Sequence, residues 1–247
     1  MEPGCYVSFR CRLSVLIILH LNILYMLAIF DLDGTLLNTI ADLAEAANYA
    51  LRKTGFPTHA LEAYPYFVGN GVRRLLYRVL PEDCRTDANV DALSLHFYQY
   101  YGTHLTDHTS PYPGVRELLD ELHSMEYKLA VASNKYQAAV SELISHFFPD
   151  VEWVAVEGQK EGVPTKPDPS IVFEILAQAS VPKSQVLYIG DSGVDMDTAR
   201  RAGVTSIGVT WGFRPESELT EHYADYIASD TAEILRLARQ NLSEPLS

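Results

Sequence analysis

Four groups of reactive side chains occur along the chain, and each has the residue types that phosphate chemistry uses. The groups are Asp31-Leu-Asp33-Gly-Thr35, Ser133-Asn134, Lys166 between Pro164 and Pro167, and Gly190-Asp191-Ser192 with Asp195 close behind. Taken one at a time, these residues have ordinary structural roles, since an Asp behind a strand is usually a cap or a turn former. Several carboxylates in one place repel one another unless a cation binds, and hard oxygen ligands suit Mg²⁺.

Together these side chains could perform phosphoryl transfer. A bound metal ion can bridge to a phosphate and neutralise its charge. One carboxylate beside it can attack phosphorus. A second carboxyl group, two residues on, can protonate the leaving oxygen and later activate water. A hydroxyl and a lysine ammonium can hold the remaining phosphoryl oxygens.

The elements that must position these groups are short apolar runs alternating with helical patterns. The pattern predicts strands over 27–30, 128–132, 152–156, 186–189 and 205–209, with a weaker one over 226–228. It predicts helices over 115–125, 137–147, 169–179 and 194–202. Such alternation indicates a parallel sheet covered on both faces. Because ligands bind beyond the carboxyl ends of parallel strands, the four groups are expected to meet at one edge.

A long interval of about 80 residues after the first strand lacks a convincing strand. Helices are predicted there over 40–53, 72–79 and 90–101, from apolar and aromatic residues at three- and four-residue spacing. The predicted fold is therefore α/β, with a Rossmann-like parallel sheet core and an inserted α-helical cap domain. We assign residues 26–40 and 110–240 to the core and residues 41–109 to the cap.

Residues 1–25 are interpreted as an upstream extension, because Met26 begins a normal-looking start and the run over 13–30 ends in the first strand. The alternative is a membrane anchor or signal peptide. The chain has three cysteines, which form no disulfide framework and favour a reducing compartment. These observations predict a cytoplasmic protein with no membrane association.

The charge balance excludes one class of function. The chain has 247 residues, with 19 basic and 32 acidic side chains and a net charge of −13. Non-specific nucleic-acid binding normally needs a basic face, so no nucleic-acid partner is expected. Segment 41–109 is near neutral, with eight acidic and six basic side chains. The expected partner is a small phosphorylated metabolite, attracted by the metal ion and nearby cations rather than by the general field.

Over residues 26 to about 235, the chain resembles the haloacid dehalogenase superfamily of phosphohydrolases, whose four motifs occur here in order. The resemblance implies that Asp31 is the nucleophile. It implies that Asp33 is the general acid and base, with a backbone carbonyl that also reaches Mg²⁺. The dehalogenases proper lack a carboxylate at the position of Asp33, so this residue favours phosphate ester chemistry.

The same resemblance implies roles for the later motifs. Ser133 and Lys166 would hold the transferring phosphoryl group. Asp191 would complete the metal ligands with Asp31 and Asp33. Asp195 would orient Lys166 or a metal-bound water without binding the ion directly.

Within the predicted cap, Val68-Gly-Asn-Gly-Val72 followed by two arginines is similar to the cap of phosphoglycolate phosphatases. This similarity implies 2-phosphoglycolate as substrate. It also implies that Gly71 and Arg74 bind the substrate together with Asn134 and the two phosphate-holding residues. The same residues could instead cap helices and form a solvated face.

Three other functions remain open from the sequence. A sugar phosphomutase resembling β-phosphoglucomutase, or a pyrophosphatase or nucleotide phosphatase, would use the same four motifs. A phospho-acceptor signalling domain also combines acidic residues with a hydroxyl and a lysine, but such domains have roughly half this length and lack a cap. The oligomeric state is expected to be monomer or homodimer.

Overall fold

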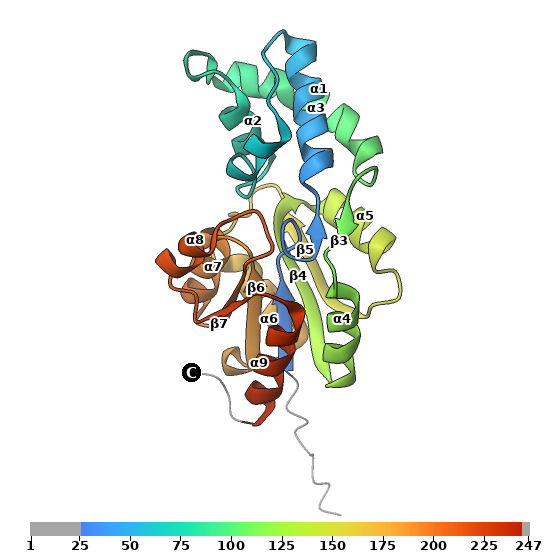
Figure 1. Cartoon of the computed structure of the whole chain (residues 1–247), viewed down its shortest axis with the longest axis vertical. Coiled ribbons are helices and arrows are strands. Elements are labelled where there is room, and N and C mark those ends of the chain that lie inside the picture. The colour runs from blue at the N-terminus through green and yellow to red at the C-terminus, as the bar shows by residue number, and fades with distance from the viewer. Residues whose placement is uncertain (1–25, 244–247) are drawn as a thin grey trace, which may run out of the picture.

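The computed structural model describes residues 26–243. They form a six-stranded parallel sheet and a layer of helices that lies beyond the carboxyl ends of the strands (Figure 1). The strand order is β5-β4-β1-β6-β7-β8. The strands are β1 Met26–Phe30, β4 Tyr127–Tyr136, β5 Trp153–Gln159, β6 Val186–Gly190, β7 Thr205–Val209 and β8 Tyr226–Ala228. The interpretation of residues 1–25 lies outside the described residues.

Helices cover both faces of this sheet, as the predicted fold requires. Alternate residues of β1 enter different cores, because successive side chains of a strand point to opposite faces. Leu27 and Ile29 pack with α6 (Ser170–Ala179) and α7 (Gly193–Ala202). Ala28 and Phe30 belong to the core that includes α4, α5 and α9. Those three helices are Val115–Ser124, Gln137–Phe147 and Thr231–Ser243. Within residues 26–243, no helix is long and apolar enough to cross a membrane.

The helical layer lies beyond the edge at which β1 ends (Figure 1). It contains α1 (Ile40–Thr54), α2 (Val72–Val79) and α3 (Asp87–His104). Two short antiparallel strands connect the layer to the sheet, namely β2 (Leu37–Asn38) and β3 (Ser110–Pro111). The predicted cap limits at 41 and 109 fall beside this strand pair and stay a prediction.

Several elements differ from the sequence prediction in length. Strand β4 continues past 132 because Tyr136 pairs with Gln159, after an irregularity in the register. Ser133, Asn134 and Lys135 therefore belong to the end of a strand rather than to a loop. Helix α3 starts earlier than predicted because the Thr86 side chain accepts a hydrogen bond from the Asn89 amide. Strands β2 and β3, α8 (Glu216–Glu221) and α9 were not predicted; all but α9 are too short for a periodic signal.

Asp42 ties the outgoing and returning connections of the helical layer together. Its carboxylate is buried in the first turn of α1 and accepts hydrogen bonds from the amides of His108 and Thr109, at 2.9 and 2.8 Å. The Thr109 hydroxyl donates a third bond at 2.7 Å. These donors are buried or half-buried, so water cannot fully replace the carboxylate as their hydrogen-bond acceptor if it is removed.

We expect Asp42→Ala to lower the free energy of unfolding by about 2 kcal/mol or more, since it leaves charge-assisted hydrogen-bond donors unpaired. Urea denaturation followed by circular dichroism measures this change. Asp91→Ala is the matched control, because Asp91 is exposed and pairs with the exposed Arg73. Its loss should stay within about 0.5 kcal/mol. Equal losses in the two variants would contradict a structural role for Asp42.

Candidate active site

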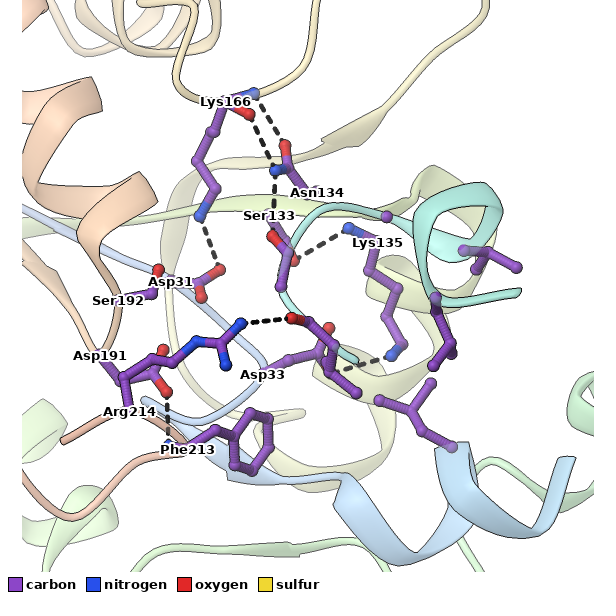
Figure 2. Close-up of a pocket in the computed structure, with 16 residues that line it drawn as sticks. Asp31, Asp33, Ser133, Asn134, Lys135, Lys166, Asp191, Ser192, Phe213 and Arg214 are labelled. Atoms are coloured by element: carbon purple, nitrogen blue, oxygen red, sulfur yellow. Dashed lines mark hydrogen bonds and ion pairs between the residues drawn. The ribbon is translucent and has the colours of Figure 1, made fainter. Parts of the chain in front are cut away.

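The four reactive groups meet at the carboxyl edge of the sheet, under the helical layer (Figure 2). Asp31 directly follows β1 and Asp191 directly follows β6, whereas Ser133 lies in the last part of β4. Lys166 reaches the same place from the loop before α6. All four, together with Asp33, line a single cavity. The sequence-predicted core residues are therefore brought together by the fold.

Lys166 is the centre of this cluster. Its buried ammonium donates hydrogen bonds to Asp31 Oδ1 at 2.8 Å, Asp195 Oδ1 at 2.7 Å and the Ala132 carbonyl at 2.9 Å. The side-chain amide of Asn134 holds the backbone of Lys166 from both sides, accepting from its N–H at 2.8 Å and donating to its carbonyl at 3.1 Å. Asn134 thus positions the lysine, in addition to lining the cavity.

Burial shapes the protonation of this cluster. Desolvation raises the pKa of Asp31 to about 7, although Lys166 opposes the shift. Desolvation also raises the pKa of Asp191 well above its usual range, and Asp195 and Asp31 add to the effect. For Lys166 burial lowers the pKa, but Asp195 and Asp31 outweigh it and keep the ammonium charged. Three carboxyl groups thus face one ammonium, and a further cation would relieve their repulsion.

The donor chemistry of this cluster fits a divalent metal ion. Oxygen atoms of Asp31, Asp191 and Asp195 all lie within 4.8 Å of one another, and all three residues are buried. An all-oxygen donor set suits a hard cation. Asp195 is already engaged, since its second oxygen accepts from the Ser192 hydroxyl at 2.6 Å and from the Ser192 amide at 3.2 Å, the second of which caps α7. This leaves Asp31 and Asp191 as the carboxylates available for direct ligation, with Asp195 holding Lys166.

Asp33 has hydrogen-bond partners of its own, separate from those of Lys166. Its Oδ1 accepts hydrogen bonds from the Thr39 hydroxyl at 2.6 Å and from Lys135 Nζ at 2.8 Å. Burial lowers the pKa of Lys135, but Asp33 and Tyr101 outweigh it and hold the pKa above its usual value. The Lys135 ammonium lies 4.9 Å from the ring centre of Tyr101 in α3, so it joins the acid to the helical layer.

The sequence analysis assigned no role to Thr39 or Lys135. The available signal for Lys135 was its position directly behind Ser133-Asn134 at a strand end. Thr39 gave no comparable signal, because its contact with Asp33 depends on the turn between β1 and α1.

The helical layer supplies the apolar wall of the cavity, including Val68, Val72 and Leu75. Gly71 lies in this wall with φ +79°, and a Cβ there would come within 3.3 Å of the Asn134 carbonyl oxygen. Arg74, which the sequence analysis expected to bind substrate, is not among the residues that line the cavity. Since α2 buries Val72 and Leu75 on one face, Arg74 projects from another face, is exposed and lies 5.4 Å from the ring centre of Tyr77.

A different arginine, Arg214, lines the cavity from the loop behind β7. The preceding residue anchors this loop, because the amide of Phe213 donates to Asp191 Oδ2 at 2.7 Å. The sequence analysis missed both residues. The signal that could have found them was the place of their loop, which follows a predicted strand and so reaches the same edge of the sheet.

Comparison with known proteins agrees with this geometry. A family model described as haloacid dehalogenase-like hydrolase matches residues 28–209. The chain belongs to this family. The resemblance seen in the sequence is thereby confirmed, and this hydrolase has the sheet and motif order that the resemblance implied.

Several proteins similar to this hydrolase carry the name phosphoglycolate phosphatase. The chain is 31% identical over 223 residues to a phosphoglycolate phosphatase of Haemophilus influenzae, a match that covers 88% of this chain and all of the relative. Two crystal structures carry the same name provisionally. One, from Lactobacillus delbrueckii subsp. bulgaricus, is 33% identical with a TM-score of 0.82 and covers 87% of this chain and 98% of its own. The other, from Haemophilus somnus, is 30% identical with a TM-score of 0.80 and covers 86% and 97%.

We expect MgCl₂ to raise the melting temperature of this hydrolase more at pH 8 than at pH 5.5. The raised pKa of Asp31, about 7 against a usual 3.8, favours the folded, cation-free protein below about pH 4. That contribution is lost as pH rises through 7, where the ionised carboxylates repel and a cation replaces the protons. At roughly 100 times its Kd the cation should add about 5 °C at pH 8. Differential scanning fluorimetry measures the shift.

Potassium chloride at equal ionic strength is the salt control for this experiment. Asp191→Asn should lose most of the shift, whereas Asp197→Asn should keep it, because Asp197 pairs with Arg200 and His222 on the outer side of α7. A shift of the same size at both pH values would contradict the proton–cation exchange.

Proposed function

We propose that this chain is a Mg²⁺-dependent phosphatase that hydrolyses 2-phosphoglycolate to glycolate and phosphate through an aspartyl-phosphate. The observation that carries the proposal is the buried contact of Lys166 with Asp31, beside Asp191 and the Ser133 hydroxyl in one cavity. It joins a carboxylate nucleophile, a cation for the phosphoryl oxygens and a metal ligand. The shared name of the relatives supports the choice of substrate.

In the first step, a carboxylate oxygen of Asp31 attacks phosphorus, and the bond to the glycolate oxygen breaks. Lys166 and Ser133 would hold the phosphoryl oxygens, because Ser133 lies at the end of β4 and Asn134 fixes the backbone of Lys166 beside it. Asp31, Asp191 and the backbone carbonyl of Asp33 would hold Mg²⁺. When bound, that ion offsets the negative charge of the carboxylates and the phosphate.

Asp33 would give a proton to the departing glycolate oxygen and then take one from the water that hydrolyses the aspartyl-phosphate. Thr39 and Lys135 fix its carboxyl group until substrate enters. The segment 41–109 would act as a cap, since its apolar wall excludes water from the reacting groups. The predicted cytoplasmic location, and the choice between monomer and homodimer, remain predictions.

Phosphate release from a panel of substrates tests this function, with 2-phosphoglycolate, pyrophosphate and β-glucose 1-phosphate each supplied with and without Mg²⁺. We expect the highest kcat/KM for 2-phosphoglycolate and no turnover without the ion. Asp31→Asn should lower turnover by at least about three orders of magnitude while circular dichroism stays unchanged, since the nucleophile is lost.

Other outcomes of this panel would select another function. Conversion of β-glucose 1-phosphate to its 6-phosphate without free phosphate would indicate the phosphomutase. Preferred cleavage of pyrophosphate would indicate the pyrophosphatase. Stable phosphorylation without turnover would indicate a signalling domain. Substantial Mg²⁺-dependent activity in Asp31→Asn would remove this residue as nucleophile.

The role of Asp33 predicts a dependence on the leaving group. With p-nitrophenyl phosphate, whose phenolate leaves without a proton, Asp33→Asn should release one equivalent of p-nitrophenol rapidly and then turn over slowly. With 2-phosphoglycolate, whose alkoxide needs a proton, the first step itself should slow by about 100-fold or more. Rapid-quench measurements separate the two steps. Normal turnover of 2-phosphoglycolate by this variant would contradict the acid and base role.

A further inference from the structure

Two arginines from different parts of the fold converge on one segment at the rim of the cavity. Arg214, behind β7, donates from Nη1 to the Pro65 carbonyl at 2.6 Å and from Nη2 to the Val68 carbonyl at 2.8 Å. Arg78, in α2, approaches the same Val68 carbonyl at 3.4 Å and donates to Asn70 Oδ1 at 2.7 Å. Figure 2 shows the Arg214 guanidinium reaching from the side of Asp191 into the pocket.

The two guanidinium groups share one acidic ion-pair partner in the part of the chain that the structure describes. This partner is Glu218, whose Oε1 lies 3.6 Å from Arg214 Nε. That oxygen also accepts a hydrogen bond from the Gly193 amide at 3.0 Å. The Arg214 side chain is only 12% exposed, so little water screens it. Burial lowers the pKa of Arg78, and the nearby charges of Arg214 and Arg74 lower it further.

A mostly buried guanidinium with unpaired N–H donors costs free energy, and an anion that accepts from those donors removes part of this cost. The carbonyls of Pro65 and Val68 accept hydrogen bonds from two of the five N–H donors of Arg214. The distance from Arg214 Nε to Glu218 Oε1 is too long for a hydrogen bond. Donors therefore remain on a planar group whose shape matches a carboxylate.

The loop that carries Arg214 lies close to Asp191, at the end of the cavity where the phosphate would bind. Phe213, its direct neighbour, is bonded to Asp191, and a Cβ on Gly212 would lie 2.2 Å from the Cβ of Asp191. The loop is thus pressed against the metal-binding end of the site, and Arg214 is one peptide unit further on, about 3.8 Å between Cα atoms. The space in the cavity open to the centres of water molecules is about 40 Å³, which favours a short substrate.

We propose that Arg214, with Arg78 behind it, binds a carboxylate of the substrate and makes this enzyme selective for phosphomonoesters of short hydroxy acids. The inference rests on the proposed phosphatase function and names the group that distinguishes its substrate from other phosphate esters. A neutral alcohol in the same place would leave the remaining N–H donors of Arg214 without an anionic acceptor.

Two pairs of substrates test the inference, and the members of each pair differ in the carboxylate. The pairs are 2-phosphoglycolate with ethyl phosphate and 3-phosphoglycerate with glycerol 3-phosphate. The wild-type enzyme should have a kcat/KM at least about tenfold higher for 2-phosphoglycolate than for ethyl phosphate. Arg214→Met should lower kcat/KM for 2-phosphoglycolate on the order of 10- to 100-fold, mainly through KM, and that for ethyl phosphate less than about threefold. Arg214→Lys should lie between, because it keeps the charge and loses the fork.

Arg73→Met is the matched control, since Arg73 lies on α2 but pairs with the exposed Asp87 and Asp91. This variant should leave kcat/KM unchanged for both 2-phosphoglycolate and ethyl phosphate. Equal losses on both members of a pair in Arg214→Met would overturn the inference and leave Arg214 as a contact that only holds the segment 65–68. Equal wild-type activity on both members would overturn it while the phosphatase function stands. No phosphate release from any substrate would instead overturn the proposed function.

A second measurement decides the matter if Arg214→Met does not fold. Glycolate should inhibit ethyl phosphate hydrolysis by the wild-type enzyme competitively, because it presents the carboxylate without a phosphate. In Arg214→Lys the inhibition constant should rise about tenfold. Absence of glycolate inhibition in the wild type, or an unchanged constant in the variant, would overturn the inference.

Discussion

The compensation of charge around Lys166 is the interaction on which the rest of the site depends. A buried ammonium alone would be costly, and so would the buried carboxylates of Asp31, Asp191 and Asp195. The ammonium and the carboxylates offset part of each other's desolvation cost, because the ammonium donates hydrogen bonds to two of the carboxylates at 2.8 and 2.7 Å. The balance is incomplete, and the three buried carboxylates fit a divalent cation that would complete it.

Several devices of the fold exist to keep this lysine in place. Asn134 holds its backbone, Asp195 accepts from its side chain and caps α7, and the end of β4 offers the Ala132 carbonyl. Asp31 and Lys166 are 135 residues apart in the chain, so no local preference could pair them. The parallel sheet does so, because it delivers the ends of β1, β4, β5 and β6 to one edge, and Lys166 lies in the loop that follows β5.

The helical layer meets this edge through polar contacts as well as apolar packing. Tyr101 lies over the ammonium of Lys135, which in turn holds Asp33. On the other side, Arg214 from the core binds carbonyls of the layer. In the proposed mechanism, Asp33 and Arg214 act on the leaving alcohol, and both are core residues that contact the layer directly or through Lys135. Selection of the alcohol and delivery of a proton to it would then depend on how the two parts sit together.

By itself the sequence determined the alternation of strands and helices, the helical insertion and the order of the reactive groups. These properties are local, because burial on both faces produces apolar runs and strand ends produce turns with polar residues. The distinctive spacing in Asp31-Leu-Asp33 identified the family without any structure. Only the tertiary structure decided which of the remaining polar side chains reach the cavity. The sequence analysis named Arg74 and not Arg214. The packing of α2 turns Arg74 outward, and the hydrogen bond from the Phe213 amide to Asp191 brings Arg214 to the cavity. Such choices depend on how elements pack, and packing between distant segments leaves no periodic signal in the chain.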